Sequence, residues 1–257
     1  MIQVLGTFTK TFKCFLRIRA VSIFTVIFLM FLLLITVVSL NKNISGSDLP
    51  LAKGVLTISM IAFSIMLAGV LNLAGSISRD RETGVLTKLK SMPIRPWQDF
   101  LGRILAVGLL SLVASVLLVA VGIAIGAQFS GGITNYLEAL GFLLLAIISA
   151  ASIGLIVGTY AKLVLAAFFT GLGIALGTAF ISGIFISYDI LPTYFRGFAH
   201  IYPISSAAAS SVYLLLGERA AGYNPLTVGQ VLSTLLISIG LLVAGVFVYS
   251  KQGWKRE

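Results

Sequence analysis

Cysteine and histidine are almost absent from this chain of 257 residues, which contains only Cys14 and His200. One cysteine excludes a disulfide within the chain, and the two residues together exclude a metal site built from several cysteines or histidines. The sequence also lacks a G-x-x-x-x-G-K-[ST] loop and has no Gly-Lys pair. Because that loop is the standard cradle for ATP phosphates, we expect the chain to bind neither a cofactor nor a metal ion itself.

Charged residues are scarce as well, at 10% of the chain, whereas 58% of the residues are hydrophobic and the mean hydropathy is +1.08. This composition is typical of an integral membrane protein. Because hydrocarbon offers no hydrogen bonds to the backbone, each span must be a helix of roughly 20 residues or a strand of a closed barrel. The apolar runs are continuous rather than alternating, which predicts an all-α membrane protein.

Six uncharged apolar runs are long enough to cross a membrane as helices. They cover about residues 20–40, 54–77, 104–127, 139–159, 163–187 and 227–249. Proton- and ion-coupled transporters usually hold ionisable residues at membrane depth, and these runs hold no Asp, Glu, Lys or Arg. Energy for transport is therefore expected to come from outside the membrane, although Ser and Thr in the runs leave sodium coupling open.

Lysine and arginine fall mostly on one side of the predicted bundle. With the amino terminus inside, 14 of the 18 basic residues are cytoplasmic, and the outer segments hold only Lys42, Lys53, Arg196 and Arg219. Since basic residues of short loops stay mostly cytoplasmic, the sequence predicts a multi-pass protein of the cell membrane with both termini in the cytoplasm. The net charge of +10 needs no nucleic acid partner, because topology and anionic membrane lipids account for it.

Residues 1–19 predict an amphipathic helix on the inner membrane face. Leu5, Phe8 and Phe12 recur at helical spacing, whereas Lys10 and other polar residues collect elsewhere. The alternative is the basic region of a signal peptide. It fits less well, because the apolar run that follows is too long and lacks a convincing cleavage pattern.

Residues 188–222 are too apolar for an ordinary loop. Pro192 and Pro203 divide them into pieces shorter than a span. We therefore expect two short helices that dip into or lie along the outer leaflet, with Tyr188 and Tyr202 among their interfacial anchors. The alternative is a surface loop with an apolar helix that covers the bundle.

The densest charge lies between the second and third runs, where residues 78–103, SRDRETGVLTKLKSMPIRPWQDFLGR, hold nine of the 26 charged residues. A charged segment between two spans predicts a cytoplasmic element that a soluble partner binds. Acidic residues near its start and lysines near its end suit the dipole of one helix over residues 78–90, which Pro93 and Pro96 would end. The alternative is a solvated loop that only sets topology.

The charged segment resembles the signature of ABC-2 type transporter permeases, R-E-x-G-x-L-x-x-L-x-x-x-P, which follows the second span in that family. The resemblance extends to six spans, an amphipathic amino-terminal helix and a broken apolar region before the last span, where Tyr202 and Pro203 form a Y-P-like element. Val85 departs from the Thr that often follows the glycine. The resemblance implies that a set of residues contacts an ATPase: Arg79, Asp80, Arg81, Glu82, Gly84, Leu86, Leu89, Lys90 and Pro93.

The resemblance also implies a function, that of the transmembrane subunit of an ABC exporter. A separate cytoplasmic ATPase would hold ATP and Mg²⁺, so this chain would not itself be an enzyme. Two permease copies, a homodimer in preference to a heterodimer, would surround a shared pathway within membrane lipid. The uncharged spans favour an amphipathic, lipidic or drug-like substrate, while the residues that line its path stay unknown.

Two other functions are compatible with the composition. A self-sufficient oligomeric channel or secondary carrier would work without an ATPase. An enzyme acting on lipids would need His200 with Asp189 and Glu218, whose spacing follows no recognisable pattern. Three G-x-x-x-G pairs predict close helix packing within the chain or a dimer face. They are Gly122 and Gly126, Gly154 and Gly158, and Gly173 and Gly177.

Overall fold

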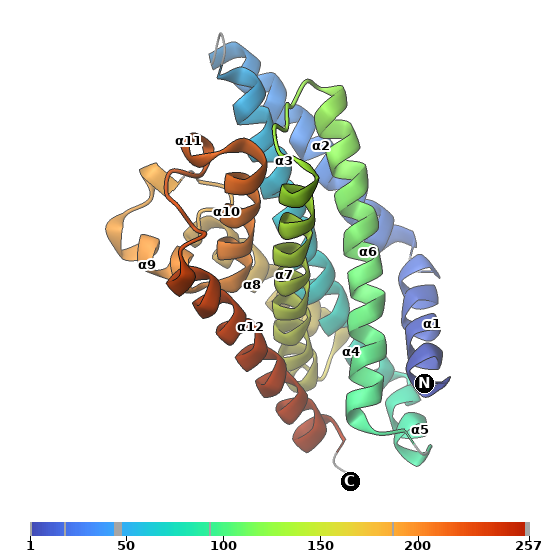
Figure 1. Cartoon of the computed structure of the whole chain (residues 1–257). Coiled ribbons are helices and arrows are strands. Elements are labelled where there is room, and N and C mark those ends of the chain that lie inside the picture. The colour runs from blue at the N-terminus through green and yellow to red at the C-terminus, as the bar shows by residue number, and fades with distance from the viewer. Residues whose placement is uncertain (1, 18, 44–47, 93, 187, 255–257) are drawn as a thin grey trace.

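The computed structural model describes residues 2–17, 19–43, 48–92, 94–186 and 188–254, of which residues 2, 16–17, 19–26, 41–43 and 189 are described by their backbone alone. The described residues form helices joined by short connections and contain no strand (Figure 1). The predicted all-α class is confirmed.

Five helical segments of the described chain are long and apolar enough to cross a membrane. The first is continuous from Leu49 to Glu82 and consists of α3, the π-helical η1 and α4. The bounds are α3 Leu49–Met66, η1 Leu67–Asn72, α4 Leu73–Glu82, α6 Pro96–Ala124, α7 Ile133–Tyr160, α8 Val164–Ile181, and α12 Val228–Val248 continued by the π-helical η3 Tyr249–Gly253.

The predicted count of six spans is not confirmed. The run at residues 20–40 lies in α2 (Arg19–Asn43), but the side chains at residues 19–26 lie outside the described part. Only Ile27–Leu40 of this helix is described as an apolar helix, and that piece is shorter than a span. Each of the other five runs coincides with one of the five long segments.

Helix α7 lies in the middle of the bundle and packs closely against the long first segment (Figure 1). Small residues permit this approach. A Cβ atom on Gly154 would overlap the carbonyl oxygen of Gly69 in η1, and one on Gly158 would lie 2.9 Å from the carbonyl oxygen of Ala74 in α4. The second G-x-x-x-G pair thus serves packing within the chain, which is one of the two roles expected of such pairs.

Helix α1 (Ile2–Arg17) lies beside the first half of α6 (Figure 1). A Cβ atom on Gly102 would lie 2.7 Å from the carbonyl oxygen of Val4, so the two backbones are in close contact. The side of α1 that is buried carries Thr7, Thr11 and Phe15, whereas Leu5 is 68% exposed. The apolar stripe predicted from the sequence is therefore only partly covered by protein, and contact of the rest with lipid stays a prediction.

Residues 188–222 form four short helices rather than two. Pro192 precedes the second and Pro203 is the first residue of the third, so both prolines divide the segment where their missing N–H groups cost least. The third helix is largely buried against α7 and α3. The bounds are η2 Tyr188–Ile190, α9 Thr193–Ile201, α10 Pro203–Leu216 and α11 Glu218–Ala221.

The tyrosines of this segment do not all lie where an interfacial anchor would. Tyr194 is 92% exposed, but Tyr202 is buried, and its hydroxyl donates to Thr178 Oγ1 at 3.3 Å. Tyr188 is half-buried and hydrogen-bonded to His200 Nε2 at 2.5 Å. The structure thus places Tyr202 in the core between α8 and α10, which differs from the predicted role.

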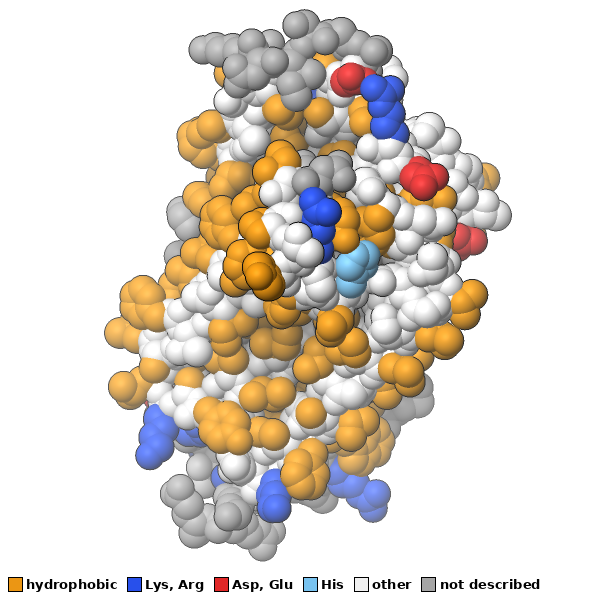
Figure 2. Space-filling view, turned by 90° about the vertical axis from the view of Figure 1, so that its left-hand side faces the viewer, with side chains coloured by type: hydrophobic (Ala, Val, Ile, Leu, Met, Phe, Trp, Pro, Cys, Tyr) orange, Lys and Arg blue, Asp and Glu red, His pale blue; other side chains and the backbone are white. Residues whose placement is uncertain are grey.

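Both ends of the described chain lie at the same end of the bundle as α5 (Val85–Ser91) (Figure 1). We name this the charged end and the other the far end. On the face shown in Figure 2, basic side chains gather at the charged end, and acidic side chains, further basic side chains and the histidine lie toward the far end. Between them is a broad band of hydrophobic side chains, as expected for a bundle whose middle contacts hydrocarbon.

Candidate coupling site

The charged segment does not form one helix over residues 78–90, so that prediction is wrong. Helix α4 ends at Glu82 and α5 begins at Val85, because Gly84 adopts a left-handed backbone with φ 70° that L side chains rarely adopt. Asp80 and Glu82 consequently lie at the carboxyl end of α4, where the helix dipole disfavours negative charge. Specific partners offset that cost for both carboxylates.

Arg103 on α6 is the centre of a buried polar network. Its side chain is fully buried, and its Nε donates to Asp99 Oδ2, one helical turn earlier, at 2.8 Å. Its Nη2 donates to Asp80 Oδ2 at 2.6 Å, and its Nη1 contacts Ser76 Oγ at 3.4 Å. One guanidinium group therefore joins the start of α6 to the end of α4 through charge-assisted hydrogen bonds, which are stronger than neutral ones.

The same network reaches both ends of the chain. Lys10 Nζ on α1 donates to Asp80 Oδ2 at 2.8 Å, and the Tyr249 hydroxyl of η3 donates to Asp99 Oδ2 at 2.6 Å. The two cations balance the two anions; Arg103, Asp80 and Asp99 are buried, and Lys10 is 34% exposed. Buried charges are generally paired in this way. We call this set of residues the Arg103 network: Lys10, Ser76, Asp80, Asp99, Arg103 and Tyr249.

Arg81 and Glu82 join the end of α4 to the turn between α7 and α8. Arg81 donates to the carbonyl oxygens of Thr159 and Ala161 at 2.8 and 2.9 Å, and Glu82 Oε1 accepts from the Val164 N–H at 2.7 Å. A cation thus lies at the carboxyl end of α7 and an anion at the amino end of α8. Both arrangements satisfy free backbone groups and suit the helix dipoles.

The residues predicted to contact an ATPase divide into two groups. Asp80, Leu86 and Leu89 are buried, the two leucines at 2% and 9% exposure, so they hold the segment together and do not face outward. Pro93 lies outside the described residues. Arg79 and Glu82 are exposed, and Arg81, Gly84 and Lys90 are half-buried. The outward surface, which we call the basic face, consists of Arg79, Glu82, Thr83, Thr87, Lys88, Ser91, Met92 and Arg95.

Sequence reasoning missed Asp99, Arg103, Lys10 and Tyr249 as site residues. Asp99 and Arg103 carried a detectable signal, since opposite charges four residues apart begin an apolar helix. Tyr249 carried none, because a tyrosine at the end of a span is ordinary. Asn72 was also missed: it is 7% exposed in η1, and within the described structure neither side-chain amide atom has a hydrogen-bond partner.

The described part of the chain contains no group of three or more His, Cys, Asp or Glu side chains placed to hold a metal ion. His200 instead contacts two aromatic rings, hydrogen-bonding Tyr188 and lying 4.5 Å from the Tyr223 ring centre. The side chain of Asp189 is outside the described part, so the geometry of a lipid-hydrolysing cluster is not defined.

Comparison with known families matches this chain to one of them. The family model for the ABC-2 type transporter matches residues 2–216, which include α1, the charged segment and α10, and end before α12. No match was found among curated proteins. The matched region covers far more than half of the chain. It includes four of the five described helical segments that are apolar enough to cross a membrane. The chain therefore belongs to the ABC-2 type transporter family, a family of membrane components of ABC transporters.

Proposed function

We propose that this chain is the permease subunit of an ABC exporter and moves an amphipathic, lipidic or drug-like substrate. A separate cytoplasmic ATPase binds and hydrolyses ATP with Mg²⁺, and the chain itself catalyses no reaction. One observation carries the proposal: an exposed basic face lies on a segment that is bonded to α1, α6, the α7–α8 turn and η3. A partner that displaces this segment displaces most of the bundle with it.

The bonds of the segment supply a route for that displacement. Movement of α5 and the end of α4 passes to α6 through Asp80 and Arg103, and to the α7–α8 turn through Arg81 and Glu82. A partner shifts the bundle between two states only if it binds them differently. Closure of two ATPase subunits on ATP would meet this condition by moving two basic faces together.

The charged end is proposed to face the cytoplasm of the cell, with both termini on that side. The distribution of basic residues supports this orientation. Lys53, counted as an outer-loop residue in the sequence, lies in α3 and donates to the Ile125 carbonyl oxygen at the end of α6 at 3.0 Å. It thus neutralises the carboxyl end of a helix at the far end, so its charge has a structural role on that side.

The test is co-purification of the full chain with candidate ABC ATPases in detergent. The variant Arg79→Glu with Lys88→Glu reverses two charges on the basic face and touches no bond of the Arg103 network. We expect the amount of ATPase that co-purifies with this variant to be about tenfold lower than with the native chain, or lower still. The new glutamates would repel acidic residues of a partner that fits a basic face.

A matched control reverses two exposed lysines outside the coupling segment and the α7–α8 turn, Lys13→Glu with Lys251→Glu. It has the same net charge as the test variant and is expected to retain the ATPase. Equal loss in both variants would assign the effect to net charge and contradict the basic face as the contact. If the folded native chain retains no ATPase at all, the channel or secondary-carrier alternative takes first place.

A second permease copy is proposed to pack on α8. Its outer side carries Leu165 and Phe169, 70% and 66% exposed, beside Gly173 and Gly177, at which an added Cβ atom would have no neighbour within 4 Å. This third G-x-x-x-G pair is therefore not used by packing within the described chain. A shallow groove of this kind lets a second helix approach closely.

Cysteine cross-linking checks the homodimer. In a Cys14→Ser background, Gly173→Cys is expected to form a disulfide-linked dimer in native membranes on oxidation. Gly141→Cys on α7 is the matched control, since Gly141 is also exposed and has no neighbour within 4 Å of an added Cβ atom. Cross-linking at both positions to the same extent would indicate random collision, and cross-linking at neither would contradict a homodimer through α8.

A further inference from the structure

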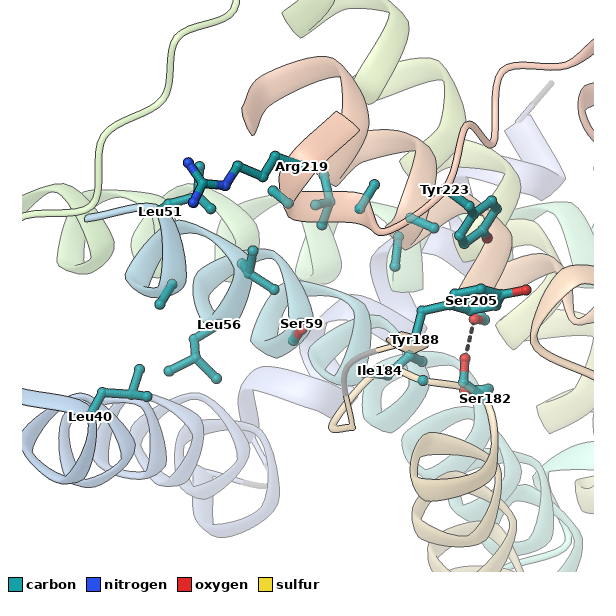
Figure 3. A pocket seen from close by; sticks show the side chains of 18 residues that line it. Leu40, Leu51, Leu56, Ser59, Ser182, Ile184, Tyr188, Ser205, Arg219 and Tyr223 are labelled. Carbon is teal, nitrogen blue, oxygen red and sulfur yellow. Dashed lines mark hydrogen bonds between the residues drawn. The ribbon is translucent and has the colours of Figure 1, made fainter. Parts of the chain in front are cut away.

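A pocket of about 330 Å³ lies at the far end, on the side of the bundle where α2 and α3 face α10 and α11 (Figure 3). Most of its wall is apolar. The wall residues include Leu40, Leu51, Val55, Leu56, Ala208 and Val212. The volume lies within the range that small-molecule sites occupy, and an apolar wall with a few polar groups is the usual composition of such sites.

Most polar groups of the pocket lie at one side of it, apart from Ser59 and Arg219. Figure 3 shows Ser182, Ser205, Tyr188 and Tyr223 close together, and Arg219 near Leu51 at the other side. Burial raises the pKa of the Tyr223 phenol above its usual value, so that group stays neutral. The side chains of Ser182 and Ser205 carry no charge, so this side of the pocket is polar and neutral.

Ser182 has a hydroxyl that the described protein does not use. The residue is 1% exposed, and its Oγ has no hydrogen-bond partner in the described structure. The neighbouring hydroxyl, that of Ser205, does have a partner: Ser205 Oγ donates to the Ser182 carbonyl oxygen (Figure 3). A buried hydroxyl without a partner is unfavourable, and this one lines a pocket large enough to admit a partner from outside the chain.

Charge narrows the class of that partner. Arg219 is the only charged residue that lines the pocket among the described residues; its side chain is 81% exposed and lies 3.5 Å from Asp48. Arg219 is thus at the mouth, already paired and solvated. An anionic ligand placed with its charged group at Ser182 would have no cation there, which burial strongly disfavours.

We propose that this pocket binds an uncharged apolar molecule that carries one hydroxyl group, with its chain along the wall between α3 and α10 and its hydroxyl bonded to Ser182 Oγ. The site belongs to a single chain. The site requires neither an ATPase nor a second permease copy, so its test is independent of the test of the transport proposal.

The test uses the purified full chain without an ATPase and a diazirine-labelled dodecanol as probe. Photolabelling is expected to saturate, to fall on peptides of α3 and α10, and to be displaced by excess dodecanol about tenfold better than by dodecane. Ser182→Ala is expected to weaken the apparent affinity for the probe about tenfold, because the variant loses one hydrogen bond to it. Its melting temperature is expected not to fall, because the hydroxyl bonds nothing in the described protein.

A pocket-filling variant provides a second measurement. Ala209→Phe adds a ring at a half-buried position that lines the pocket and is expected to abolish saturable labelling. Ala244→Phe on the exposed side of α12 is the matched control and is expected to label as the native chain does. Labelling that does not saturate, that spreads over α12, or that is unchanged in Ser182→Ala would overturn the proposal. If dodecane displaces the probe as well as dodecanol does, the ligand's hydroxyl contributes nothing to binding, and the proposal is likewise overturned.

Discussion

Replacing Arg103 with methionine is expected to reduce the free energy of unfolding by about 3–5 kcal/mol, because it leaves buried carboxylates without their partner. Asp80 keeps Lys10, but Asp99 keeps only the hydroxyl of Tyr249. The fully buried position allows little water to compensate. The measurement is the melting temperature of the purified chain in detergent, together with the yield of folded monodisperse protein.

Arg95→Met is the matched control, since Arg95 is an exposed arginine of the same segment. It is expected to change the free energy of unfolding by less than about 0.5 kcal/mol. Adding Asp99→Asn to Arg103→Met is expected to recover part of the lost stability, because it removes the charge that had lost its partner. If Arg103→Met and Arg95→Met unfold at the same temperature, the network has no stabilising role.

Gly154→Ala is expected to cost about 3 kcal/mol, a large effect for one methyl group. The added carbon would overlap the carbonyl oxygen of Gly69, a backbone atom that no side-chain rotation moves aside. The α7 and η1 backbones must separate to admit it. Their separation would also loosen the contacts of Gly158 with Ala74. Thermal unfolding of the purified variant in detergent measures the loss.

Gly141→Ala is the control on the same helix, where an added Cβ atom meets nothing within 4 Å. Removing a glycine from a helix interior gains up to about 1 kcal/mol, so this variant is expected to be equally or slightly more stable. A fall in stability of similar size at both positions would mean that the close crossing of α7 and η1 does not decide the effect at Gly154.

The helices were largely predictable because continuous apolar composition is a local property. Five of the six runs coincide with long helices, and the charged segment lies between two of these helices, as predicted. The structure differs from the prediction in the helices within that segment. Gly84 breaks the segment into α4 and α5, a choice of backbone angle that charge pattern and helix dipole arguments do not determine.

The roles of individual charges were less predictable. Asp80 was expected to contact a partner, and Leu86 to pack into a partner or against the amphipathic helix; the structure buries both side chains. The two carboxylates of the network have partners that are distant in sequence: Arg103 lies 23 residues from Asp80, and Tyr249 lies 150 residues from Asp99. Spacing along one helix predicts the Asp99–Arg103 pair, whereas contacts across four elements follow only from how those elements pack.

The amino-acid sequence by itself determined that this is a helical membrane protein, where its long apolar helices run and where charge interrupts them. Hydrocarbon accepts only helices or closed barrels, and the apolar runs are continuous rather than alternating. Only the tertiary structure decided which of those charges are internal and which remain on the basic face. It also decided that Ser182 borders a pocket and that its hydroxyl has no hydrogen-bond partner among the described residues. Burial and long-range pairing depend on residues brought together from distant parts of the chain, and no local pattern contains that information.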